Sequence, residues 1–201
     1  MSHAFCCWCR QGLVQVDGLW WCPTSACRQR QREHGLGVSG GKRGWRWLYV
    51  PTPKQVEFDA CPAKYVLYGG AAGPGKSHAA RWALYRKCRR HAGYEALILR
   101  KTFPELEKTH LRRMASDAPL IGATFTESKR LMTFPNGSLI ECGHMEDAGA
   151  VEKYLSTEYH CIVADEGSTF EPQPLLELST RARRITPDSP KLGDLRRDGR
   201  Y

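Results

Sequence analysis

The stretch "GGAAGPGKSHAA" at residues 69–80 constrains the fold of this 201-residue chain most strongly. Within it, Gly70, four further residues and then Gly75-Lys76-Ser77 match the pattern G-x-x-x-x-G-K-[ST] at every required position. Glycines at these places allow backbone N–H groups to converge on phosphates, and the helix that follows adds the positive end of its dipole. The pattern therefore predicts a phosphate-binding loop between a strand and a helix.

The residues on both sides of this loop favour the same interpretation. The run "AKYVLYGG" (63–70) is short, apolar and typical of a strand, and "SHAARWALYRKCRRH" (77–91) has helical spacing. We therefore expect ATP and Mg²⁺ as cofactors. Lys76 is expected to reach the β- and γ-phosphates and Ser77 to ligate Mg²⁺. Three glycines are expected to line the phosphates: Gly70, Gly73 and Gly75.

The stretch "EYHCIVADEGSTF" (158–170) predicts the other half of a nucleotide hydrolase site. Its apolar run "CIVA" has the pattern of a buried strand and ends in the acidic pair Asp165-Glu166. We expect Asp165 to hold Mg²⁺ through its water shell and Glu166 to polarise the attacking water as general base. Taken alone, the pair has a polar turn as its alternative, which the phosphate-binding pattern upstream disfavours.

Strand and helix patterns alternate between these two motifs. "EALILR" (95–100) has a buried-strand pattern, "FPELEKTHLRRMA" (103–115) a helical one, and residues 123–134 that of a strand pair turning at Ser128-Lys129. "PNGS" (135–138) is a hairpin turn signal. This order predicts an α/β fold in which a mainly parallel sheet is flanked by helices. The ATPase domain is expected over residues 47–186, followed by a polar tail over 187–201.

Five of the nine cysteines fall before residue 28, and four have the spacing of a zinc site: Cys6, Cys9, Cys22 and Cys27. Two close thiolate pairs joined by a short hairpin suit tetrahedral Zn²⁺, and Asp17-Gly18 between them is a hairpin turn signal. We expect a small zinc ribbon over residues 1–30, with Cys7 as an alternative ligand to Cys6. A pair of disulfides is the other interpretation, which a reducing compartment disfavours. The remaining cysteines are predicted core residues: Cys61, Cys88, Cys142 and Cys161.

The chain carries 30 Lys and Arg against 21 Asp and Glu, a formal net charge of +9. This balance favours polyanionic partners, nucleic acid first. Residues 31–46 are basic and rich in glycine, which predicts a flexible linker that is either a plain tether or a contact to a phosphate backbone. No apolar run is long enough for a membrane span and the start has no secretory signal, so we expect a cytoplasmic protein.

Six segments taken in order resemble the large subunit of tailed-phage terminases, the motor that packages double-stranded DNA into the procapsid. The resemblance covers residues 47–185 and is carried by "YVPTPKQVEF", "GGAAGPGKS", "LILRKTFPEL", "FPNGSLIECGHM", "VEKYLSTEYHCIVADEGSTF" and "LLELSTRARR". It implies a P-loop NTPase fold of the terminase ATPase type, ATP hydrolysis and binding of duplex DNA. It also implies a homo-oligomeric ring on a portal protein, a small terminase subunit as partner, and a place in the host cytoplasm.

The resemblance further implies roles for residues outside the two motifs. Gln55 occupies the position of a glutamine that contacts adenine, although this residue also suits a helix surface. Arg100 matches an arginine after the second strand, with a role near the nucleotide or between subunits; a surface salt bridge is the alternative. The arginine that stabilises γ-phosphate charge has five candidates: Arg112, Arg113, Arg181, Arg183 and Arg184.

The chain departs from the family pattern after residue 185. Terminase large subunits continue with a coupling segment and a nuclease domain of ribonuclease H type, and neither motif is found in this sequence. We therefore expect a chain shortened before the nuclease domain, with nucleotide binding a firmer expectation than turnover and with no DNA cleavage. The alternative function is a zinc-dependent DNA-binding protein with an incomplete or vestigial P-loop core. A helicase-like ATPase would need downstream motifs that the sequence does not contain.

Overall fold

The computed structural model describes residues 14–16, 19–21, 36–39, 45–70 and 75–182. The chain divides into two compact units, Met1–Ala83 and Leu84–Tyr201, and each is described by itself below. Helix α3 (Lys76–Arg90) runs through the division, as expected from the helical spacing of residues 77–91. The domain boundary expected between residues 46 and 47 remains a prediction.

The described part of the first unit contains two antiparallel strand pairs. Strand β1 (Val14–Val16) pairs antiparallel with β2 (Leu19–Trp21), which confirms the hairpin predicted around Asp17-Gly18. Strands β3 (Leu36–Ser39) and β4 (Trp45–Tyr49) form the second antiparallel pair. The linker predicted over residues 31–46 did not include these strands, because its glycines and basic residues outweighed the short apolar runs beside them. The predicted zinc ligands and Cys7 lie outside the described residues.

Helix α2 (Pro53–Ala60) begins at a capping box, in which the Thr52 side chain accepts from the Gln55 backbone N–H and the Gln55 side chain accepts from the Thr52 backbone N–H. Pro53 occupies the first helical position, where no backbone donor is needed. The strand predicted over residues 63–70 is absent, and Leu67 there is 96% exposed. That prediction was wrong because apolar, β-prone residues form a strand only where a neighbouring strand meets their backbone groups.

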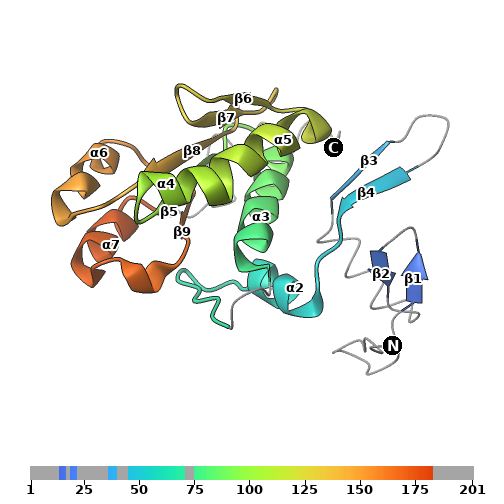
Figure 1. The fold of residues 1–201 in the computed structure, drawn as a ribbon, viewed down its shortest axis with the longest axis horizontal. Helices are drawn as coiled ribbons and strands as arrows, with labels where there is room; N and C mark the ends of the chain where they lie inside the picture. Colours follow the sequence, from blue (N-terminus) through green and yellow to red (C-terminus); the bar gives the residue numbers. More distant parts are fainter. Residues whose placement is uncertain (1–13, 17–18, 22–35, 40–44, 71–74, 183–201) are drawn as a thin grey trace. The chain divides into compact units, whose positions relative to one another are not determined.

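The second unit is built on a five-stranded sheet in the order β6-β7-β8-β5-β9 (Figure 1). Its strands are β5 (Glu95–Arg100), β6 (Thr124–Thr126), β7 (Leu131–Thr133), β8 (Leu139–His144) and β9 (Cys161–Ala164). Strand β5 lies between β8 and β9 and pairs in parallel with both, whereas β7 pairs antiparallel with β6 and with β8. The α/β fold is as expected. The sheet is mixed rather than mainly parallel, because short hairpin turns can join only antiparallel strands.

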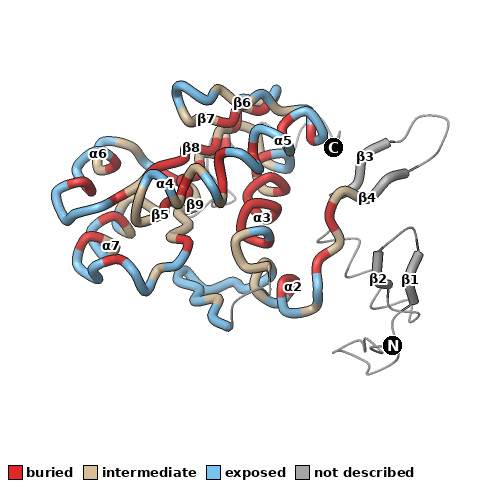
Figure 2. Tube along the Cα trace, in the orientation of Figure 1, coloured by how far each residue is buried: buried red, intermediate tan, exposed pale blue. Residues whose placement is uncertain are grey.

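Helices cover both faces of this sheet. Leu97 and Leu99 of β5 pack into an apolar core with Tyr154 of α6 (Glu152–Leu155) and Leu178 of α7 (Pro172–Ser179). On the opposite face, Cys142 of β8 contacts Met114 of α5 (Arg112–Ile121), with 3.3 Å between their sulfur atoms. Figure 2 shows that the buried residues follow the sheet and the helix faces turned toward it.

The remaining helical segments are short. The helix predicted over residues 103–115 is α4 (Phe103–Leu106), the π-helical turn η2 (Glu107–Leu111) and then α5. Two 3₁₀ turns, η3 (Ala148–Val151) and η4 (Gly167–Thr169), precede α6 and α7. Among the described residues, every helix is too short or too polar to cross a bilayer.

The four cysteines outside the first 28 residues lie in different environments. Cys88 and Cys142 are buried, as predicted, and burial raises the pKa of the Cys88 thiol, which therefore stays protonated at neutral pH. Cys161 is partly buried. Cys61 is exposed, which contradicts its predicted core position, because it follows the last residue of α2 and precedes the irregular segment 62–70.

Gly143 in β8 is a position where the fold has no room for a side chain. A Cβ atom there would lie 2.7 Å from Cζ of Tyr154, whose hydroxyl is held by both the N–H and the C=O of His144. We expect Gly143→Ala to destabilise the protein by about 1–3 kcal/mol, as overpacked core positions do. Urea unfolding measures this, with Gly167→Ala as control because a Cβ at Gly167 meets nothing within 4 Å. Equal stability of the two variants would contradict the prediction.

Candidate functional site

A hydrogen bond joins the two described ends of the loop that the sequence pattern predicted. Lys76 Nζ donates to the Gly70 carbonyl over 2.9 Å, across the segment 71–74 that lies outside the described residues and contains Gly73. Gly70 and Gly75 have φ of 139° and 74°, conformations that glycine adopts at little cost. The Gly75 carbonyl accepts the Ala79 N–H at 2.8 Å, so the loop leads directly into α3. Lys76 and Ser77 thus lie in the first turn of this helix.

Gln55 ties helix α2 to the end of this loop. Its Oε1 accepts from the Thr52 N–H at 2.8 Å and from the Tyr49 hydroxyl at 3.2 Å, and its Nε2 donates to the Gly75 carbonyl at 3.4 Å. The residue is buried, and Tyr49 also stacks on Trp82 of α3 with ring centroids 5.4 Å apart. Gln55 therefore positions Gly75 in this structure, and its amide is engaged with the chain's own groups.

The acidic pair follows β9 at its carboxyl end. Because Leu99 pairs with Ala164, the next residues, Arg100 and Asp165, lie side by side at the ends of neighbouring parallel strands. Arg100 Nη1 lies 3.3 Å from Asp165 Oδ2 and 3.2 Å from Glu166 Oε1. Arg100 and Asp165 are only 6% and 7% exposed. A buried carboxylate requires such a partner, since an unpaired buried charge is strongly unfavourable.

Glu166 differs from Asp165 in both backbone and exposure. Its φ of 55° and ψ of 51° are left-handed, a conformation that costs a residue other than glycine about 1 kcal/mol or more. Its side chain is 54% exposed, although it shares Arg100 with Asp165. With this strained backbone, the two adjacent carboxylates lie in different environments. The Asp165 carboxylate is buried and fixed, and the Glu166 carboxylate is accessible to solvent.

His110 is a member of this cluster that the sequence interpretation missed. Its Nε2 lies 2.9 Å from Asp165 Oδ2, and its side chain is fully buried. It lies on η2, which follows β5 and α4, so one continuous stretch supplies both Arg100 and His110 to Asp165. A signal was present: Leu106, His110, Met114 and Ala118 recur every four residues, and His110 is the polar residue in an otherwise apolar stripe.

The predicted site residues thus form two groups, one in each unit. The first unit brings together Gln55, Gly70, Gly75 and Lys76, and the second brings together Arg100, Asp165 and Glu166. The candidates for an arginine acting on the γ-phosphate lie elsewhere. Arg112 is exposed and pairs with Glu107 at 3.0 Å, Arg113 is exposed, and Arg181 is partly buried after α7; Arg183 and Arg184 lie outside the described residues.

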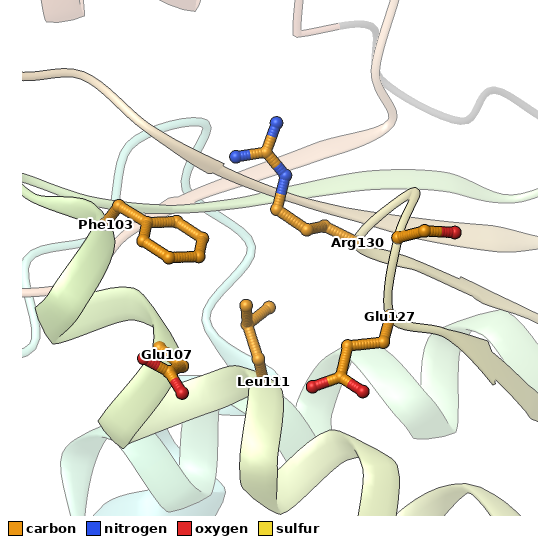
Figure 3. Close-up of a pocket in the computed structure, with 6 residues that line it drawn as sticks. Phe103, Glu107, Leu111, Glu127 and Arg130 are labelled. Carbon is orange, nitrogen blue, oxygen red and sulfur yellow. The ribbon is translucent and has the colours of Figure 1, made fainter.

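A separate surface hollow of about 380 Å³ lies beside η2 (Figure 3). Glu107 and Glu127 enter it from facing walls, with Leu111 between them and with Phe103 and Arg130 above. Arg130 has a φ of 52°, and its guanidinium lies 5.8 Å from the Phe103 ring centroid. The turn η2 therefore supplies Glu107 and Leu111 to this hollow and His110 to Asp165.

The donors at the end of β9 fit a magnesium ion better than a metal held by protein ligands alone. Magnesium keeps several waters and is usually held by one or two carboxylates together with substrate phosphates. A single fixed carboxylate such as Asp165 meets that need. Within the described part of the chain, no group of three or more His, Cys, Asp or Glu side chains is arranged to hold a metal ion.

Comparisons of the chain with protein-family models, with curated proteins and with solved structures gave no match.

Proposed function

We propose that this chain is a P-loop ATPase that binds ATP with Mg²⁺ and hydrolyses it. The observation that carries the proposal is the cluster at the end of β9. There a buried aspartate is fixed by Arg100 and followed by an exposed glutamate, in a chain whose helix α3 begins with a G-x-x-x-x-G-K-S loop. Adjacent carboxylates with different environments suit different tasks, one holding a cation and one handling a proton.

Each residue has a defined role in this proposal. The loop from Gly70 to Gly75 supplies backbone N–H groups to the phosphates, and Lys76 exchanges its bond to the Gly70 carbonyl for the β- and γ-phosphates. Ser77 and Asp165 would hold Mg²⁺, which when bound neutralises charge on the phosphates. Glu166 orients a water and accepts its proton. Gln55 keeps the loop at the start of α3 through Gly75.

The substrate of the motor is proposed from the terminase-like order of the segments over residues 47–185. We propose that ATP hydrolysis drives packaging of double-stranded DNA, with the chain acting in a ring on a portal protein together with a small terminase subunit, in the host cytoplasm. The net charge of +9 supports a polyanionic partner. Isothermal titration of the full chain with ATP and Mg²⁺ tests the nucleotide site. One site per chain is expected, and no binding would overturn the proposal.

One observation favours a second candidate, a zinc-dependent DNA-binding protein with an incomplete ATPase core. The strand expected before the phosphate-binding loop is absent from residues 63–70, so within the described residues no strand leads into Gly70. This candidate predicts zinc-dependent binding of duplex DNA that ATP does not alter. The first candidate predicts ATP turnover, so the two are separated by a single measurement of hydrolysis.

Metal analysis of the purified, reduced chain is expected to find one zinc per chain, held by Cys6, Cys9, Cys22 and Cys27. In the sequence, one close cysteine pair precedes the hairpin of β1 and β2 and the other follows it, an order that suits tetrahedral coordination. Replacement of Cys9 and Cys22 by serine is expected to abolish the bound zinc, whereas Cys61→Ser, an exposed cysteine outside the set, is expected to leave it unchanged. Zinc-free wild-type protein would contradict the assignment.

A further inference from the structure

We propose that His110 is a positioning residue, which fixes the carboxylate of Asp165 in the orientation needed to hold magnesium. This inference rests on the proposed nucleotide site and adds a residue that the sequence motifs do not contain. It is carried by three observations: the contact of His110 with Asp165, the complete burial of the imidazole, and the π-helical turn that supplies it.

In the hydrogen bond between His110 and Asp165, the histidine is the donor. An ionised carboxylate can only accept hydrogen bonds, so the Nε2 of His110, 2.9 Å from Asp165 Oδ2, must carry the proton and donate it. Arg100 Nη1 reaches the same oxygen at 3.3 Å from the neighbouring strand. Two donors from different elements, a strand end and a helical turn, therefore converge on Oδ2, and together they restrict rotation of the carboxylate.

The turn that carries His110 departs from regular helix geometry. Residues Glu107–Leu111 are π-helical, a form that is rare and is often found at functional sites. The hydroxyl of Thr109 within this turn donates to the carbonyl of Glu105. The turn begins seven residues after Arg100, so the continuous stretch of β5, α4 and η2 supplies both Arg100 and His110 to the aspartate. A leucine at position 110 would continue the apolar stripe of Leu106 and Met114 and would bury no polar group that needs a hydrogen bond. Packing alone therefore does not require a histidine here.

Removal of the His110 donor is expected to lower the affinity for magnesium rather than the affinity for the nucleotide itself. Groups that orient a metal-holding side chain typically change metal affinity by about 10–100-fold when they are removed. Contacts of Lys76 and the loop to phosphates do not involve His110, so binding of nucleotide in the absence of metal should be unaffected. Loss of the His110 donor is therefore expected to raise the magnesium concentration required while leaving metal-free nucleotide binding unchanged.

The test uses the full chain and a fluorescent ATP analogue, bound first in excess EDTA and then titrated with Mg²⁺. His110→Gln retains an amide N–H at a reach close to that of Nε2, whereas His110→Asn carries the same group on a shorter side chain, and His110→Leu removes the donor. Met114→Leu, a substitution one turn further along the same stripe, is the matched control for packing. Thermal unfolding of each variant accompanies the titrations.

We expect all variants to bind the analogue equally in EDTA. His110→Gln and Met114→Leu should need the same Mg²⁺ concentration as the wild type for half-maximal effect, and His110→Asn and His110→Leu about tenfold more. If His110→Leu does not fold, the Gln and Asn pair decides. A wild-type magnesium requirement in the Asn variant would overturn the role of His110 and leave the nucleotide site standing. A wild type that binds no analogue would overturn the proposed function and this role with it.

Discussion

Replacement of Lys76 by alanine is expected to lower the affinity of the chain for ATP by about a hundredfold or more. A hydrogen bond to a charged group contributes about 1.5–3 kcal/mol, and the lysine is proposed to reach two phosphates, so both contributions are lost together. In this structure the ammonium group donates a hydrogen bond to the Gly70 carbonyl at 2.9 Å, so it lies beside the first glycine of the pattern. Isothermal titration with ATP and Mg²⁺ measures the change.

Lys54→Ala is the matched control for this experiment. Lys54 is an exposed lysine on helix α2 of the same unit, and it belongs to neither the loop nor the capping box. Its replacement changes the net charge by the same amount and is expected to leave ATP affinity unaltered. If Lys76→Ala bound ATP as tightly as Lys54→Ala, the loop would not be the phosphate site.

Replacement of Glu166 by glutamine is expected to leave ATP binding intact and to lower turnover by about 10²–10⁴-fold, the usual contribution of a general base. Glutamine has nearly the same shape but cannot accept the proton of the attacking water. The side chain of Glu166 is half exposed and contacts Arg100 at 3.2 Å, so the substitution removes an ion pair near the surface and little packing. Release of phosphate under saturating ATP measures the effect.

Glu171→Gln provides the control, because Glu171 is an exposed glutamate a few residues further along the chain, just before α7. It is expected to hydrolyse ATP at the wild-type rate. Turnover by Glu166→Gln equal to that of the control would remove Glu166 as the base, while retained binding would keep the loop assignment.

The elements that were predicted correctly from the sequence are those whose local residue pattern matches their position in the sheet. Residues 95–100 and the run "CIVA" are short, apolar and bounded by polar residues, and both are buried or half-buried strands. The hairpin turn at residues 135–138 carries Gly137 at a φ of 79°, a conformation that the sequence "PNGS" favours. The position of the acidic pair could be predicted because residues that directly follow a strand in the sequence lie at the carboxyl end of that strand in the fold.

The elements that the sequence did not predict depend on contacts remote in the chain. The run at 63–70 has strand propensity, but among the described residues no strand pairs with it, and propensity alone does not satisfy its backbone groups. The sheet is mixed because short turns join β6, β7 and β8 as antiparallel neighbours, whereas β5 pairs with β8 in parallel although the two strands are far apart in the chain. His110 could not be assigned because its partner is 55 residues away, and only the register of β5 and β9 brings Asp165 under the turn.

Steady-state ATP hydrolysis by the purified full chain, with and without linear duplex DNA, decides whether this chain is an ATPase. We expect Mg²⁺-dependent turnover that falls by at least a hundredfold in Glu166→Gln and that duplex DNA alters. Absence of turnover under both conditions, in protein that still binds duplex DNA, would contradict it and would favour the zinc-dependent DNA-binding protein.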